Sequence, residues 1–373
     1  MVNRNRIIDR FVEMVEIDSV SGREGQFKEY LKELLRQRGL IVTEDRAGES
    51  LGGNAGNLLA VWPGSAPGTK LLFCAHMDTV EPGTGIKAVV DDKCINSSGE
   101  TILGADDKAG IAALLEAIDC IREQNLPHSD VELLFTVGEE QGLQGSKFFD
   151  YSPLQATMAF VLDGGGEPGE IIIQSPCQNE IEYIAYGKSA HAGINPEDGL
   201  NAIHLVSQAL AVMPSGRIDE ETTCNFGVIE GGTARNIVAD VCRVKGECRS
   251  LQRTKLDKLT DQLVSTFQDE VAKRGGRAEV QVTFLYPEIQ LDEDHPVVQL
   301  AIKAAEQAGL QPVLTSTGGG SDASIINGQG IPCVNLGIGM RQVHTTNEYI
   351  LIDDLVKDAE FVLKIIALAT EEA

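Results

Sequence analysis

Residues 71–78 read Leu-Leu-Phe-Cys-Ala-His-Met-Asp, an apolar run that ends in a histidine and a carboxylate. Similar apolar runs occupy residues 57–61, 131–137 and 158–162, and apolar residues at helical spacing occupy 6–17, 24–38 and 108–123. The runs are short and do not alternate with polar residues, which is typical of strands buried on both faces. This order predicts an α/β fold whose mainly parallel sheet is flanked by helices.

The middle of the chain follows a different order. Strand-like and helical segments succeed one another at residues 181–186, 199–213, 222–229, 237–248, 254–274 and 278–284. The resulting βαββαβ order is that of the ferredoxin-like split motif, a compact unit of two layers. We therefore expect a catalytic domain formed by residues 1–177 and 290–373, interrupted by an inserted α+β domain at 178–289.

Composition restricts the classes of partner and compartment. The 373 residues include 31 Lys and Arg against 56 Asp and Glu, a net charge of −25. Such a surface repels phosphate backbones and anionic lipids, so we expect neither nucleic-acid nor membrane binding. The eight cysteines include no Cys-x-x-Cys pair, and the charged N-terminal segment does not resemble an export signal. These features favour a cytoplasmic protein with free thiols.

Histidine and carboxylate side chains follow the predicted strands at the point where each strand ends. They are His76 and Asp78, Glu139 and Glu140, Asp163, and the later His344, while Asp106 begins a predicted helix. Ligands of open parallel sheets bind beyond the carboxyl ends of the strands. The sequence therefore predicts one site at this edge of the sheet.

Two imidazoles among several carboxylates, without a thiolate, favour zinc, with Co²⁺ or Mn²⁺ as substitutes. The excess of carboxylates suits two ions that share a bridging carboxylate. His76 and Asp78 are two residues apart, so on an extended strand Asp78 would accept a hydrogen bond from the imidazole. Glu139 and Glu140 are adjacent and would point apart, leaving one of them free as a general base.

The motifs together resemble the aminoacylase/carboxypeptidase family of co-catalytic zinc peptidases. They are HMDTV, GADDKAG, TVGEEQG, VLDGG, SAHAG, GGTARN, GGGSDAS and the late His344, in one order along almost the whole chain. The resemblance implies that His76 and Asp163 hold one zinc ion and that Glu140 and His344 hold the other. It further implies that Asp106 bridges the ions before a cis peptide bond, Asp78 orients His76 and Glu139 is the general base.

The inserted domain contributes the expected substrate contacts. By the resemblance, His191 reaches a site to bind substrate or stabilise the oxyanion, in many relatives from a partner subunit. A homodimer through the inserted domain is therefore expected. Arg235 and Arg249 are candidates for binding a substrate carboxylate, although both equally suit pairing with surface acids. Asn236 and Ser321 are candidate polar contacts near the cleft.

The expected function is that of a metal-dependent exopeptidase acting on short peptides. The motifs most resemble those of family members that remove the N-terminal residue of tripeptides. Two alternatives stay open: a related zinc amidohydrolase or carboxypeptidase that acts on N-acyl amino acids or C-terminal residues, and a non-catalytic relative that binds peptide or metal. The presence of Glu139 argues against the last alternative, because a binding protein needs no free base beside Glu140.

Overall fold

The computed structural model describes residues 1–371, which form two compact units. Unit 1 comprises residues 1–174, 290–317 and 321 onward, and unit 2 comprises residues 175–289 with the short segment Gly318–Gly320. Each unit has its own hydrophobic core, and the two cores share no residue.

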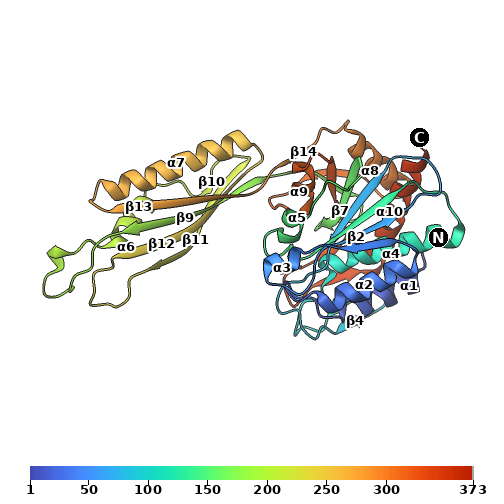
Figure 1. Ribbon diagram of the computed structural model, residues 1–373, viewed down its shortest axis with the longest axis horizontal. Helices are drawn as coiled ribbons and strands as arrows, with labels where there is room; N and C mark the ends of the chain where they lie inside the picture. The colour runs from blue at the N-terminus through green and yellow to red at the C-terminus, as the bar shows by residue number, and fades with distance from the viewer. Residues whose placement is uncertain (372–373) are drawn as a thin grey trace. The chain divides into compact units, whose positions relative to one another are not determined.

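Unit 1 is built around a nine-stranded sheet (Figure 1). In spatial order its strands are β1 (Ile41–Glu44), β2 (Leu58–Trp62), β6 (Val131–Thr136), β3 (Leu71–His76), β7 (Met158–Gly164), β16 (Cys333–Gly337), β8 (Glu170–Ser175) and β14 (Ile289–Gln290), with β15 (Val313–Ser316) also paired to β8. The four central strands, β6, β3, β7 and β16, run parallel. The neighbouring strands β1, β2 and β8 pair antiparallel, so the sheet is mixed around a parallel centre.

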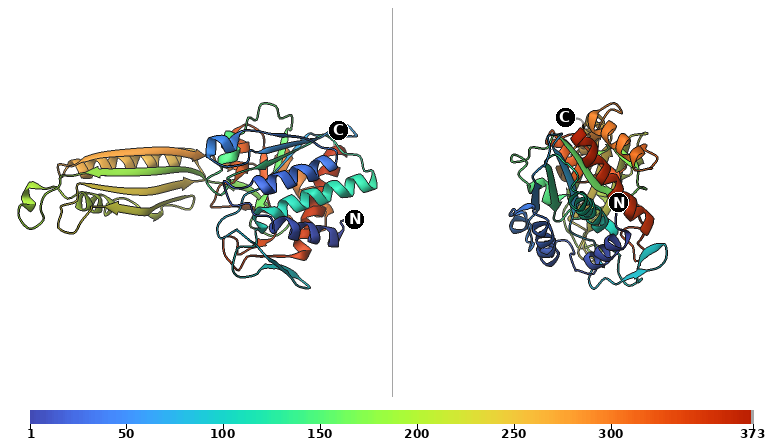
Figure 2. Two further views of the ribbon diagram at one scale, coloured as in Figure 1. Left: turned by 60° about the horizontal axis from the view of Figure 1, so that its bottom comes forward. Right: turned by 90° about the vertical axis from the view of Figure 1, so that its right-hand side faces the viewer.

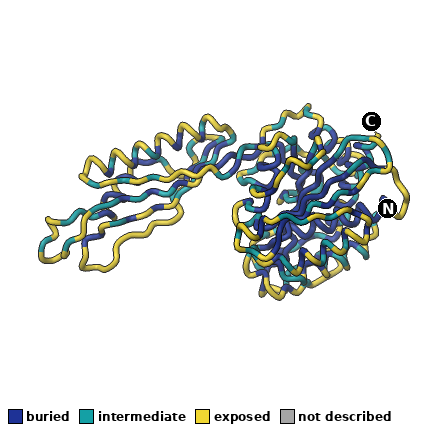
Figure 3. Tube along the Cα trace, viewed as in Figure 1, coloured by how far each residue is buried: buried dark blue, intermediate teal, exposed yellow. Residues whose placement is uncertain are grey.

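Helices cover both faces of this sheet (Figures 1 and 2). They are α1 (Arg4–Val15), α2 (Gly25–Gln37), α3 (Ala47–Leu51), α4 (Ala105–Gln124), α5 (Gln144–Phe148), α8 (Pro296–Gln307), α9 (Asp322–Gly328) and α10 (Ile352–Glu371). Phe73 of β3 belongs to the core that α4 completes, whereas the neighbouring Cys74 contacts Asp322 of α9. Successive residues of a strand face opposite sides, so β3 needs apolar residues throughout. Every residue of β3 is buried, and Figure 3 shows the strands of the central sheet as mostly buried.

A small antiparallel sheet adjoins these elements in unit 1. Its order is β17 (Met340–Arg341), β18 (Tyr349–Leu351), β5 (Cys94–Ser97) and β4 (Ala88–Val90). The loop between β17 and β18 carries His344. Pairing of β18 with β5 therefore fixes the base of a loop that holds one of the expected metal ligands.

Unit 2 has the expected ferredoxin-like βαββαβ order. Its elements are β9 (Cys177–Tyr186), the 3₁₀ turn η1 (Pro196–Asp198), α6 (Ala202–Leu210), β10 (Gly216–Arg217), β11 (Thr222–Gly231), β12 (Val241–Ser250), α7 (Arg253–Ala272) and β13 (Arg277–Tyr286). The antiparallel sheet has the order β10-β11-β12-β9-β13. Helices α6 and α7 pack on one face, where Tyr183 and Phe267 are fully buried.

The fold predicted from the sequence is confirmed, with the sheet mixed at its edges rather than parallel throughout. In the part of the chain that the structure describes, no helix is long and apolar enough to cross a membrane.

Candidate active site

Side chains from five segments of unit 1 meet beyond the carboxyl ends of its parallel strands. His76 is the last residue of β3, and Glu139 and Glu140 follow β6. Asp163 is the second-to-last residue of β7. Asp106 comes from the start of α4, and His344 comes from the β17–β18 loop. The meeting of these residues, which are far apart in the sequence, follows from the parallel alignment of β6, β3 and β7.

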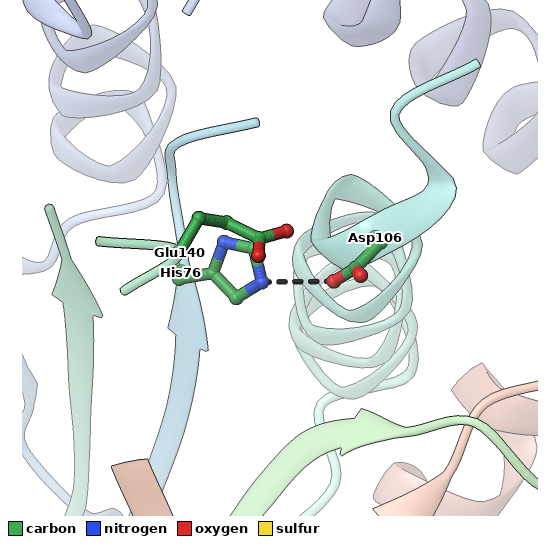
Figure 4. Close-up of side chains that lie close together, drawn as sticks. All are labelled: His76, Asp106 and Glu140. Atoms are coloured by element: carbon green, nitrogen blue, oxygen red, sulfur yellow. Dashed lines mark hydrogen bonds and ion pairs between the residues drawn. The ribbon is translucent and has the colours of Figure 1, made fainter. Parts of the chain in front are cut away.

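The carboxylate of Asp106 lies between two histidines. Its Oδ1 is 2.9 Å from Nε2 of His76, and its Oδ2 is 3.1 Å from Nε2 of His344. Figure 4 shows the imidazole of His76 directed at this carboxylate, with Glu140 beside it. Because each oxygen faces a different histidine, Asp106 has the geometry required of a ligand shared by two ions. The peptide bond between Asp106 and Asp107 is cis, as the sequence resemblance implied.

Glu140 and Asp163 each lie beside one of the two histidines that face Asp106. Oε1 of Glu140 lies 2.9 Å from Nε2 of His344, and Oδ1 of Asp163 lies 3.8 Å from Nε2 of His76. Two groups of side chains could each hold a metal ion, because the potential ligand atoms within a group all lie within 4.8 Å of one another. One group is His76, Asp106 and Glu140, and the other is His76, Asp107 and Asp163. Asp107 was not among the ligands expected from the sequence.

Asp78 is fully buried, but it contacts His76 differently from the expectation. Nδ1 of His76 lies 2.9 Å from the backbone carbonyl of Asp78 and 3.5 Å from its carboxylate. Strand β3 ends at His76, so the extended geometry assumed for this pair does not continue to Asp78. The carboxylate instead accepts hydrogen bonds from Ser21 Oγ, at 2.6 Å, and from the backbone N–H groups of Glu139 and Glu140, at 3.0 and 3.3 Å. Asp78 thereby holds the loop that carries both glutamates.

The cluster contains more carboxylates than histidines. Among the described residues, no lysine or arginine forms an ion pair with Asp106, Glu139, Glu140 or Asp163. Burial, with the charge of Asp163 adding to it, raises the pKa of Glu139 well above its usual value. Burial likewise raises the pKa of Glu140 to about 7, with the charge of Asp106 next in importance. These carboxylates are close to one another, and they outnumber the two histidines that face them.

The pKa values of both histidines are also raised, in this case by their carboxylate neighbours and against the effect of burial. The hydrogen bond to Asp106 raises the pKa of His344 to about 9, against the effect of partial burial. Burial acts to lower the pKa of His76, but the hydrogen bond to Asp106 and the charges of Asp106 and Asp78 raise it well above its ordinary value. A group of imidazole and carboxylate ligands with excess negative charge fits divalent cations, which supply the missing positive charge. The residues present therefore fit a site for two metal ions.

Several residues that the sequence reasoning missed support the cluster. Lys108 is fully buried, where its Nζ donates to the carbonyl of Ile17 at 2.8 Å, and burial lowers its pKa to about 7. Glu24 is also buried and accepts from the backbone N–H of Gly138, at 3.2 Å, next to Glu139. Lys108 stands in the motif GADDKAG, but the motif does not reveal its distant partner Ile17, and Glu24 stands in no motif.

The expected substrate contacts fall mostly on unit 2. His191 is exposed, and its segment pairs with that of Ile237, so that the backbone carbonyl of Asn236 accepts from Ala192 N at 3.0 Å. Arg235 is exposed in the same β11–β12 loop. His191, Arg235 and Asn236 thus lie on two adjoining loops of unit 2.

The two remaining candidates have structural partners. Arg249 of β12 pairs with Glu247, with Nε to Oε1 at 2.9 Å, and donates to the carbonyl of Gly318 at 3.1 Å. Ser321 belongs to unit 1, where it is buried and its Oγ caps α9 by accepting from Ala323 N at 3.3 Å. A direct role of either residue in substrate binding stays a prediction.

Comparison with known proteins gives matches over the whole chain. Residues 72–368 match the model of peptidase family M20/M25/M40. The chain is 43% identical to protein YqjE of Bacillus subtilis over 371 residues, all of both chains. The solved structure of aminopeptidase PepT from Bacillus cereus is 42% identical, with a TM-score of 0.93 over 98% of each chain. A tripeptidase from Staphylococcus aureus is 39% identical, with a TM-score of 0.96 over the full length of both chains.

Proposed function

The chain belongs to peptidase family M20/M25/M40, and we propose that it is an aminopeptidase that releases the N-terminal residue of tripeptides. Membership makes it a metal-dependent peptidase. The observation that carries the catalytic part of the proposal is the carboxylate of Asp106, which offers one oxygen to each of two histidines. The similarity to an aminopeptidase and a tripeptidase at 39–42% identity supports the narrower substrate class.

We assign the metal ligands as follows. His76 and Asp163 would hold one ion, Glu140 and His344 would hold the other, and Asp106 would be the ligand that both share. The lack of a thiolate and the mixture of imidazole and carboxylate favour two Zn²⁺ ions, for which Co²⁺ or Mn²⁺ could substitute. When bound, such ions polarise the scissile carbonyl and lower the pKa of the attacking water.

Glu139 is assigned as the general base. It lies in the loop held by Asp78, and its carboxylate has no described ion-pair partner. Burial raises the pKa of Glu139, which makes its carboxylate a better proton acceptor than an ordinary glutamate. Glu139 takes one proton from the attacking water and delivers it to the leaving amine, so the carboxylate is regenerated at the end of the reaction.

The exposed residues of unit 2 are assigned to the substrate. His191 stabilises the developing oxyanion, while Arg235 and Asn236 bind polar groups of the short peptide. Arg249 is the second candidate for the substrate carboxylate, although its pair with Glu247 competes for the guanidinium. Ser321, which caps the start of α9, is assigned as a polar contact of the substrate. Unit 2 is also proposed as the interface of a homodimer, which a scattering mass in solution would test.

We propose that the protein resides in the cytoplasm, a reducing compartment, because its thiols are free. All eight cysteines, each within the described residues, are free. Seven of them are buried, where they pack as small apolar side chains.

The decisive experiment compares a free tripeptide with its N-acetylated and C-amidated forms. We expect the Zn²⁺-loaded protein to cleave the free and the C-amidated peptide at the first bond and to leave the N-acetylated peptide intact. Glu139→Gln should lower kcat by about 10²–10⁴-fold while retaining the metal content of the wild type, because Glu139 is not a ligand. Metal content measured by atomic spectroscopy is the control.

Each alternative function has its own outcome in this experiment. Cleavage of the N-acetylated peptide would refute the proposed aminopeptidase activity and would favour an acylase or a carboxypeptidase. No hydrolysis of any peptide by the metal-loaded protein would favour the non-catalytic relative. A Glu139→Gln variant within about tenfold of the wild-type rate would remove the general-base assignment.

A further inference from the structure

Glu348 is a buried carboxylate at the base of the loop that carries His344. Its exposed fraction is 1%. Its Oε2 accepts hydrogen bonds from the backbone N–H groups of Leu103, at 2.7 Å, and Gly104, at 2.9 Å. Its Oε1 accepts from the backbone N–H of Asp106, at 3.2 Å. The side chain therefore contacts the backbone of the residue whose carboxylate lies between the two histidines.

The segment that leads into the regular turns of α4 depends on this side chain. Gly104 adopts a left-handed conformation (φ 77°), and Asp106 and Asp107 have non-helical backbone angles. The N–H groups of this irregular segment are buried and need acceptors. Glu348 supplies the acceptors from 242 to 245 residues away in the sequence.

The backbone of Glu348 is itself held by hydrogen bonds to two other residues. Its carbonyl accepts from Ser97 N at 3.0 Å, and its N–H donates to the carbonyl of Thr345 at 3.2 Å. The next residue begins β18, which pairs with β5. His344, four residues before Glu348, adopts the left-handed conformation that bulky residues rarely take (φ 61°). One residue thus joins the His344 loop to the start of α4.

We infer that Glu348 is a positioning residue for the metal centre: it holds the backbone of Asp106 in register with His344, so that one carboxylate can serve two ions. The inference rests on the proposed metallopeptidase function. Glu348 acts through Asp106 and is not itself assigned as a ligand. Removal of its contacts would leave three buried N–H groups without an acceptor and free the Asp106 carboxylate to move. Partners that orient metal ligands typically change metal affinity by about 10–100-fold when they are lost.

Glu132 offers a matched control. It too is a buried glutamate that accepts only backbone N–H groups, from Gln155 at 3.0 and 3.1 Å and from Ala156 at 3.0 Å. It lies near the start of β6, at the end of the sheet opposite the cluster, because Glu139 and Glu140 follow the other end of the same strand. A loss of stability caused only by an unsatisfied buried group should appear in both variants.

The test measures metal binding in Glu348→Gln, Glu348→Asp and Glu132→Gln with Co²⁺ as the probe. Glutamine keeps one acceptor oxygen but turns an NH₂ group toward a backbone donor. We expect Glu348→Gln to weaken Co²⁺ binding by about 10–100-fold and to alter the visible absorption of the bound ion. Glu132→Gln should keep the affinity and the spectrum of the wild type, even if its unfolding temperature falls equally. Glu348→Asp keeps the charge with a shorter reach and should bind with intermediate affinity.

Wild-type affinity and spectrum in Glu348→Gln, or equal changes in Glu132→Gln, would overturn the inference. If Glu348→Gln does not fold, Glu348→Asp decides, since wild-type Co²⁺ affinity in that variant would contradict the assigned role. The readout uses no peptide. A wild-type protein that binds Co²⁺ but cleaves no tripeptide would refute the proposed function and leave the positioning role intact.

Discussion

Asp358 of α10 is a carboxylic acid buried without a partner. Neither of its oxygens has a hydrogen-bond donor among the described residues, and its exposed fraction is 2%. Burial, with the charge of Asp354 one turn away, raises its pKa well above the usual value. The folded protein therefore retains a proton on Asp358 at a pH where the unfolded chain has released it.

This proton makes stability depend on pH in a defined direction. Because the pKa of Asp358 is raised in the folded state, its contribution is present below the unfolded pKa of about 4 and is lost as pH rises above it. Asp358→Asn cannot titrate, so we expect it to match the wild type near pH 4 and to be more stable than the wild type at pH 7. Unfolding curves at the two pH values measure the difference.

Asp354→Asn is the matched control on the same helix. Asp354 pairs with Arg341 at 2.6 Å, so its neutralisation should lower stability at pH 7. A gain from Asp358→Asn that is the same at both pH values would show that its proton is not the cause.

The sequence predicts candidate metal ligands and a candidate base, but it does not predict the residues that hydrogen-bond to the segments carrying them. His76, Asp106, Glu139 and Glu140 stand where strands or helices begin or end, so their side chains could be assigned to one edge of the sheet. Glu348 follows His344 by only four residues, but its role is to accept N–H groups from the distant segment 103–106. No local pattern encodes that long-range contact.

At the scale of elements, α4 approaches β7 through a glycine. A Cβ atom added to Gly110 would lie 2.5 Å from Oδ1 of Asp107 and 2.6 Å from the carbonyl oxygen of Leu162, closer than such atoms pack. The absence of a side chain lets the helix lie close to the strand. This close approach also places the start of α4, with Asp106, beside the end of β3 that carries His76.

Gly110→Ala is therefore expected to destabilise the protein by about 1–3 kcal/mol, because overpacking outweighs the better helix propensity of alanine. Gly25→Ala in α2 is the control, since its added Cβ would meet only the exposed side chain of Asn54, at 3.0 Å. Chemical denaturation measures both. A Gly110→Ala variant as stable as Gly25→Ala would contradict the close packing of α4 on β7.

The direction of strands was the part of the fold that the sequence could not supply completely. The central strands β3, β6 and β7 were expected to be parallel because helices or long connections separate them. Strand β2, however, pairs antiparallel with β6, although its sequence Leu58–Trp62 is as apolar as that of a parallel strand. Strand direction depends on the path of the connecting chain, which apolar content does not reveal.

At the scale of the whole molecule, the two separate cores make the response to metal removal specific. The expected ligands belong to unit 1 alone, whereas unit 2 has its own core around Tyr183 and Phe267. Metal that binds only the folded state stabilises it by about 2.7 kcal/mol when its concentration is one hundred times its Kd. Removal of metal should therefore lower the stability of unit 1 selectively.

Calorimetry with and without a chelator checks this expectation. We expect chelation to abolish peptidase activity and to lower the temperature at which unit 1 unfolds, while the transition of unit 2 stays in place. Added Zn²⁺ should restore both properties. Equal shifts of the whole profile would show that the two units unfold as one.

The contact between Asp106 and His344 has a consequence for synthesis of the chain. The two residues are 238 positions apart. At elongation rates of about 5–20 residues per second, the ribosome needs roughly 12–48 s to reach His344 after it has added Asp106. Glu140 and Asp163 are added within this interval, and His344 is the last of the proposed ligands to be made. The proposed metal site therefore stays incomplete until translation is almost finished.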